Sequence, residues 1–197
     1  MTGIDHERAS TDATVVLAQD HRRIEEMLRA LSAGSLDMAT YRHLMDQTII
    51  ELVQHSVAEE LFLFPAVREY VPGGAELADH ELENNAQTER VMKILDALNP
   101  ADMTFEPQVS VLRSLVGAHI AHEEAVMFPA LLQAAAPDFR DQIGERILAS
   151  KSYGPTRPHP DAPSTPPGNI LLAAGTGLVD RVRDALSHRG QDTDPAD

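Results

Sequence analysis

Residues 55–65 read HSVAEELFLFP, and residues 119–129 read HIAHEEAVMFP. Both stretches are His-x-x-x-Glu-Glu-x-x-x-Phe-Pro, so they agree at five fixed positions within eleven residues. An Asp-His pair precedes each copy, at residues 20–21 and 79–80, and the next repeat begins 34 and 39 residues after its His (21 to 55, 80 to 119). The sequence is therefore two copies of one unit, with Asp-His on its first segment and His-x-x-x-Glu-Glu on its second.

Helical periodicity places these motifs on four helices. Apolar residues recur every three or four positions in each segment, and short turns containing Gly or Pro separate the segments. We expect helices over about 11–32, 37–71, 75–98 and 107–134. Pro65 and Pro129 should break or kink the second and fourth helices near their ends. The pattern predicts an all-α fold, an up-down-up-down four-helix bundle.

The remaining chain divides into tails and an extension. Residues 1–10 are expected to be a flexible tail, and the bundle with its site occupies 11–150, including a short fifth helix at about 139–150 that covers one end of the bundle. Residues 154–168 contain six of the 13 prolines, which predicts an extended tether within a Pro-rich C-terminal extension, 151–197. A short amphipathic helix follows at 178–186. This extension either packs back on the bundle or mediates self-association, for example as a homodimer.

Composition narrows the class of function. The 197 residues include 16 Lys+Arg against 31 Asp+Glu, a formal net charge of −15. Nucleic acids and anionic membranes attract basic surfaces, so this charge argues against both partners. The absence of Cys excludes disulfides, thiolate ligands and thiol nucleophiles. No apolar run is long enough to span a membrane, and the N-terminus is polar and acidic, so we expect a soluble, cytoplasmic protein.

Polar residues occupy the inward stripe of every bundle helix. Steps of three and four residues define one helix face, and on each helix those steps pass through motif residues. The third helix is expected to turn residues 77, 80, 84, 87 and 91 inward, which includes Asn84. The titratable residues that converge on the bundle centre are His21, His55, Glu59, His80, His119 and Glu123.

This convergence predicts a metal site. A single His on an apolar stripe is usually a hydrogen-bonded core residue, but burying four imidazoles and two carboxylates without compensation costs several kcal/mol per charge. A bound cation removes that cost. Imidazoles and carboxylates without thiolate suit iron, manganese or zinc, and two carboxylates able to bridge favour two ions over one.

Residues beside the stripe leave alternatives open. His122 either joins the ligands or makes a hydrogen bond at the boundary, and Glu83 is a further candidate ligand where Asn84 cannot serve. Glu60 and Glu124 are either partners behind the ligands or solvent-facing charges. The Asp residue before each ligand His is expected at the surface or as a helix cap.

The duplicated motifs resemble the haemerythrin-like family, also called HHE cation-binding domains, over about residues 12–150. The stretch at 153–160, YGPTRPHP, is similar to the extension of bacterial members. The resemblance implies a non-haem di-iron site in which two carboxylates and an oxo or hydroxo group bridge two iron ions. Carried over position by position, it implies terminal imidazole ligands at His21, His55, His80 and His119, and bridging carboxylates at Glu59 and Glu123.

Two departures from the family pattern bear on function. The oxygen carriers of the family have a fifth His where this chain has Asn84, and their last carboxylate is usually an Asp at spacing five, where Glu123 stands at spacing four. With two His per iron the expected site is more symmetric than theirs. This disfavours reversible oxygen carriage and favours chemistry at two accessible metals.

We therefore expect a di-iron protein that takes hydrogen peroxide or O2 as its small ligand. The first hypothesis is catalase-like or peroxidase-like turnover, with no catalytic residue separate from the metal centre. The second is a sensor of O2, nitric oxide or iron, or an oxygen store without turnover. A third is a structural bundle held by a zinc or iron ion.

Overall fold

The chain folds as an all-α protein. The computed structural model describes residues 11–34, 36–164, 169, 176–177, 179–180 and 183–184, and these include no strand. The predicted tail at 1–10 lies outside them, as does most of the predicted helix at 178–186. No helix in the described part of the chain is long and apolar enough to cross a membrane. The elements are α1 (Ala13–Leu31), α2 (Met38–Ala58), η1 (Glu59–Leu63), α3 (Phe64–Tyr70), α4 (Gly74–Ala97), α5 (Phe105–His122), η2 (Glu123–Met127), α6 (Phe128–Ala134) and α7 (Pro137–Ser150).

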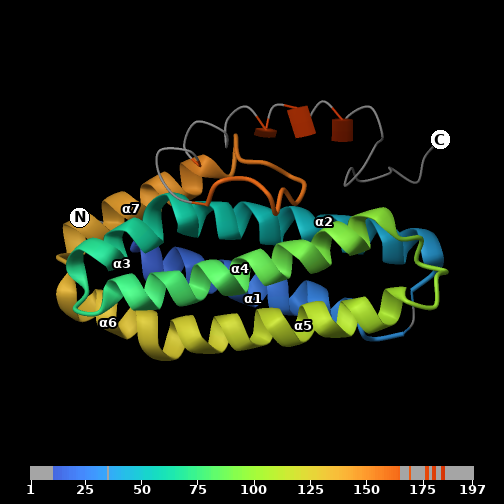
Figure 1. Ribbon diagram of the computed structural model, residues 1–197, viewed down its shortest axis with the longest axis horizontal. Helices are drawn as coiled ribbons and strands as arrows, with labels where there is room; N and C mark the ends of the chain where they lie inside the picture. The colour runs from blue at the N-terminus through green and yellow to red at the C-terminus, as the bar shows by residue number, and fades with distance from the viewer. Residues whose placement is uncertain are drawn as a thin grey trace, which may run out of the picture.

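The predicted four-helix bundle is confirmed. Helices α1, α2, α4 and α5 run side by side, and the units α2–η1–α3 and α5–η2–α6 each form one long helix (Figure 1). The predicted fifth helix is α7. It packs along α1 and also touches η1 and α2.

Each long helix accommodates its proline through a widened turn and continues beyond it. The segments η1 and η2 are π-helical, and the N–H groups of Phe64 and Phe128 bond to the carbonyls of Glu59 and Glu123, five residues back. A proline in a regular α-helix clashes with the carbonyl four residues before it, and a wider turn relieves that clash. Of the expected break or kink, the break is therefore wrong, and the kink stays a prediction.

The extra residue in each wide turn also changes which side chains face the core. Regular helical steps of three and four residues would continue the inward stripe from Glu59 to Phe62 and Ala66, and from Glu123 to Val126 and Ala130. Beyond η1, Leu63 and Val67 are fully buried, Ala66 is buried as well, and Phe62 is only half-buried. Beyond η2, Met127 and Leu131 are fully buried, whereas Val126 is exposed.

Two hydrophobic clusters make up the core, one toward each end of the bundle. One is built around Phe64 and Leu131, and the other around Phe105 and Met45. Residues that follow each other on one helix belong to different clusters: Leu17 lies in the first and Ile24 in the second. His21, which stands between them, is fully buried. A polar layer that includes His21 therefore separates the two hydrophobic clusters of the core.

The described part of the Pro-rich extension packs on the bundle. Arg157 pairs with Asp96 of α4 at 3.2 Å, and the Asn169 amide donates to the Glu60 carbonyl at 3.3 Å. The backbone N–H groups of Thr156 and Arg157 donate to one oxygen of Asp180. These contacts favour the first of the two expected roles. Self-association stays a prediction.

A glycine sets the approach of α7 to the start of α1. A Cβ atom at Gly144 would lie 1.8 Å from the Thr11 carbonyl oxygen, a backbone atom that cannot move aside cheaply. Gly117 in α5 has no atom within 4 Å of its Cβ position. Substituting Gly144 therefore tests the close packing, and substituting Gly117 is the matched control.

We predict that Gly144→Ala lowers the free energy of unfolding by roughly 1–3 kcal/mol, because overpacking forces α7 away from α1. Gly117→Ala should instead stabilise the protein by about 0.5–1 kcal/mol, since Ala is the better helix former. Urea unfolding followed by circular dichroism measures both. Equal effects of the two variants would contradict the close approach of α7.

Candidate metal centre

Five buried residues from the bundle helices and the two wide turns meet at the centre of the molecule. They are His21 of α1, His55 of α2, Glu59 of η1, His119 of α5 and Glu123 of η2. One nitrogen or oxygen of each lies within 4.8 Å of the corresponding atoms of the other four. Both carboxylates stand at the first residue of a π-helical turn. Such turns are frequent at functional sites.

The atoms that converge in this cluster lack hydrogen-bond partners within the protein. His21 Nε2 lies 3.4 Å from Glu123 Oε2, and His119 Nε2 lies 3.5 Å from Glu59 Oε1. His55 Nε2 is 2.7 Å from Glu59 Oε1, but the pair is not aligned for a hydrogen bond. Unpartnered buried imidazoles and carboxylates are costly, and they are the donors that iron and zinc take. The donor set therefore fits metal ions.

The outward nitrogen of each imidazole faces a second carboxylate. The pairs are His21 Nδ1 with Glu124 at 2.9 Å, His119 Nδ1 with Glu81 at 2.7 Å, and His55 Nδ1 with Asp20 at 3.6 Å. A carboxylate behind a histidine fixes the tautomer and leaves Nε2 free to bind a metal. The arrangement therefore turns all three Nε2 atoms toward the same small volume.

Charged neighbours hold these outer carboxylates in place. Asp20 is buried and forms ion pairs with Arg23 and Lys151, and Glu124 forms one with Arg22. Asp20 was expected at the surface or as a helix cap, and that expectation was wrong. The sequence signal was available, since Asp20 directly precedes a histidine of the inward stripe.

The third bundle helix turns a different face inward from the one expected. Its buried residues are Gly74, Ala78, Glu81, Asn85, Thr88, Met92 and Leu95. The expected stripe through positions 80 and 84 was therefore wrong by one residue. Glu81 and Asn85 take the inward positions, and Asn85 donates to Glu59 Oε2 at 3.3 Å.

The other candidate ligands lie outside the five-residue cluster. The His80 side chain is 57% exposed, and with Glu81 and His122 it forms a second group of close metal-type ligands. Asn84 is half-buried and donates to Glu81 at 3.1 Å. Glu83 is exposed and belongs to neither group. The ligand assignment of all these residues stays a prediction.

Comparison with known proteins identifies the family. A family model described as "Hemerythrin HHE cation binding domain" matches residues 12–131. The chain belongs to the haemerythrin HHE cation-binding family.

The individual relatives match this chain at low sequence identity. An uncharacterised haemerythrin-like protein of Schizosaccharomyces pombe is 25% identical over 170 residues, which cover 85% of this chain and 83% of the relative. A protein named DNA nickase from Nostoc sp. is 26% identical over 139 residues, 70% of this chain but only 38% of that protein. The crystal structure of a haemerythrin HHE domain-containing protein from Mycobacterium kansasii is similar in fold. Its TM-score is 0.63 at 21% identity, covering 72% of this chain and 85% of the other.

In the buried five-residue cluster without metal, His21 tends to be neutral, as metal binding requires, whereas Glu123 and His119 tend to hold protons. Burial lowers the pKa of His21 to about 4, with the His55 charge acting in the same direction. Burial, followed by the charge of Glu59, raises the pKa of Glu123 well above its ordinary value. Burial disfavours the charge on His119, yet Glu123 and Glu59 outweigh it and raise that pKa. Protons therefore take the place of metal charge in the metal-free cluster.

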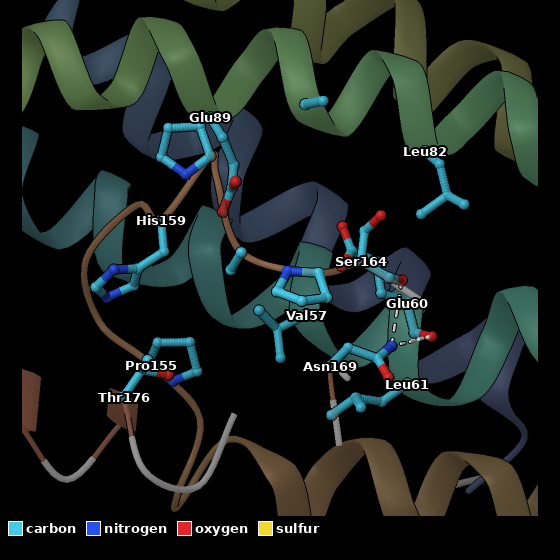
Figure 2. A pocket seen from close by; sticks show the side chains of 14 residues that line it. Val57, Glu60, Leu61, Leu82, Glu89, Pro155, His159, Ser164, Asn169 and Thr176 are labelled. Atoms are coloured by element: carbon cyan, nitrogen blue, oxygen red, sulfur yellow. Dashed lines mark hydrogen bonds between the residues drawn. The ribbon is translucent and has the colours of Figure 1, made fainter. Parts of the chain in front are cut away.

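A cavity of about 80 Å³ lies between α2–η1, α4 and the Pro-rich extension, and none of the five cluster residues lines it (Figure 2). Glu60 and Glu89 line it on the bundle side, and His159 and Asn169 line it on the extension side. Burial, followed by the charges of Glu89 and Glu59, raises the pKa of Glu60 to about 9. Glu60 is thus a neutral hydrogen-bond donor near pH 7, next in sequence to a residue of the cluster. The volume holds a few water-sized molecules.

We predict that Glu124→Ala weakens metal binding about 10–100-fold, because it removes the carboxylate that orients His21. Glu124 is partly exposed, so the fold should survive. Metal content after dialysis against a competing chelator measures the effect. Glu25→Ala is the matched control, since Glu25 also pairs with Arg22 but does not contact His21. Equal affinity of the two variants would argue against the role of Glu124.

Metal affinity should fall as the pH falls. The raised pKa values of His119 and Glu123 mean that both groups tend to hold protons, and a metal must displace those protons. Affinity should therefore rise between pH 6 and pH 8, about tenfold per pH unit for each proton released. Zn²⁺ titrations in buffers of different ionisation enthalpy count the protons. Binding without proton release would show that the cluster is already deprotonated.

Proposed function

We propose that this protein is a non-haem di-iron protein that binds and turns over hydrogen peroxide or O2 at a carboxylate-bridged iron pair. The observation that carries the proposal is the set of five converging, unpartnered buried donors in a haemerythrin HHE domain. Three imidazoles and two carboxylates without a thiolate suit iron.

The residues that would hold the ions are those of the cluster. His21, His55 and His119 offer Nε2, and Glu59 and Glu123 each stand close to two of these imidazoles. Their donors are fewer than two octahedral ions require, so positions stay open to a small ligand. The iron pair would supply the oxidation and the reduction that together convert two hydrogen peroxide molecules into water and O2.

The chain's own residues support a small neutral ligand. The cavity at Glu60 has room for a molecule the size of water or peroxide, and the neutral Glu60 carboxyl can donate a hydrogen bond to it. Asn85 donates to Glu59, and its hydrogen bond with Glu60 offsets only part of the rise in the Glu60 pKa, so one amide contacts both neighbouring glutamates. The net charge of −15 does not oppose the approach of an uncharged molecule.

We predict that iron-loaded protein evolves O2 from hydrogen peroxide in an oxygen electrode, at a rate above that of free iron, whereas metal-free protein does not. His55→Ala should lower the rate by more than about tenfold, since even the loss of a group behind a ligand costs 10–100-fold in activity. His43→Ala, on the same helix but outside the cluster, is the control.

Circular dichroism confirms that each variant is folded. Equal activity of the iron-loaded and metal-free proteins would eliminate the enzymatic proposal. A diferrous protein that forms an oxygen adduct reversible under argon, without turnover, would favour binding or sensing instead.

A further inference from the structure

Three metal-type ligands of α4 and α5 lie together and adjoin the buried cluster through Glu81, which contacts His119. His80 and Glu81 are neighbours on α4, and His122 is the last residue of α5. One ligand atom of each lies within 4.8 Å of the other two. The side chains of His80 and His122 are 57% and 30% exposed, whereas Glu81 is fully buried. An ion can therefore reach this group from solvent, while its carboxylate is held within the protein.

The spacing between His80 and Glu81 leaves room for a cation, whereas His122 Nδ1 contacts the same Glu81 oxygen directly. His80 Nε2 lies 4.0 Å from Glu81 Oε1, which is too long for a hydrogen bond. Zinc-type ions bind His nitrogen and carboxylate oxygen at about 2.0–2.2 Å, so two ligands of one ion lie up to roughly 4.2 Å apart. The rings of His80 and His122 meet edge to face, with centroids 5.0 Å apart. Two imidazoles and one carboxylate are thus presented together.

Glu81 serves the buried cluster with one oxygen and the outer group with the other. Its Oε2 accepts a hydrogen bond from His119 Nδ1 at 2.7 Å, and its Oε1 contacts the His122 ring. In the described part of the chain, no Lys or Arg forms an ion pair with Glu81. The buried carboxylate therefore relies on histidines alone for its counter-charge.

We propose that His80, Glu81 and His122 bind one divalent cation in a second, solvent-facing site, which holds metal ions on their way to the buried cluster. Two imidazoles and a carboxylate select ions such as Fe²⁺, Co²⁺ and Zn²⁺ over Mg²⁺ and Ca²⁺, which prefer all-oxygen sites. Only the destination of the ion rests on the proposed function of the cluster. The proposal of the site itself depends only on His80, Glu81 and His122.

The competing explanation is that Glu81 only orients His119 and His122 through hydrogen bonds. Substituting His80 distinguishes the metal site from this explanation, because the His80 ring contacts Glu81 and His122 but none of the five cluster residues. Its exposure also makes His80→Ala harmless to the fold. Two controls remove a group outside the site: Glu83→Ala on the same helix and His43→Ala on another.

Co²⁺ titration by visible absorption and equilibrium dialysis tests the site. The wild-type protein should bind one more Co²⁺ per chain than His80→Ala or His122→Ala, and both control variants should match the wild type. The same difference should persist when the buried cluster is first loaded with iron. An unchanged count in both His variants would overturn the proposal. Because metal-free protein is titrated as well, failure of the buried cluster to take iron would be seen separately.

The holding role is tested by the rate at which Fe²⁺ enters the buried cluster under anaerobic conditions. His80→Ala should load several-fold more slowly than the wild type and reach the same final iron content. Loading at the wild-type rate, with the outer Co²⁺ lost, would overturn the role in delivery. A lower final content would show that His80 belongs to the buried centre itself and would overturn the separate site.

Discussion

The desolvation of two carboxylates at the centre of a helical bundle is the constraint on which the rest of this structure depends. Glu59 and Glu123 are fully buried, and each would cost several kcal/mol if left without a counter-charge. Three imidazoles surround them, and each imidazole faces a second carboxylate. The polar layer therefore extends outward until it reaches cations such as Arg22 and Lys151. The two hydrophobic clusters flank this layer.

The wide turns reconcile that layer with a continuous apolar core. Each turn begins at a buried carboxylate and ends just before Phe-Pro, so the extra residue enters between the polar layer and the apolar end of the bundle. The register then moves by one position, which buries Leu63 and Met127. This geometry explains why Phe-Pro follows the paired glutamates in both copies of the repeat. The proline needs the wider turn, and the wider turn starts at the metal-type ligand.

The sequence predicted the parts of the fold whose signal is apolar or repeated. The four bundle helices, the fifth helix and the convergence of His21, His55 and His119 with the two glutamates follow from periodicity and from the duplication. The face of α4 did not follow, because its buried stripe contains Glu81, Asn85 and Thr88, and buried polar residues leave no hydrophobic pattern. Asp20 was missed for a related reason. A carboxylate is expected in water unless its partner is known, and that partner is set by the tertiary fold.

The shifted face of α4 breaks the symmetry that the duplicated sequence implies. The first unit supplies two imidazoles, His21 and His55, whose ring centroids are 4.9 Å apart. The second supplies one imidazole, His119, which lies 5.9 Å from His55, and it places Glu81 behind that ring. Two ions held here would receive unequal sets of donors, in contrast to the two His per iron expected from the sequence. The second half of the bundle also carries Asn85, which donates to Glu59 and interacts with Glu60, a residue that lines the cavity.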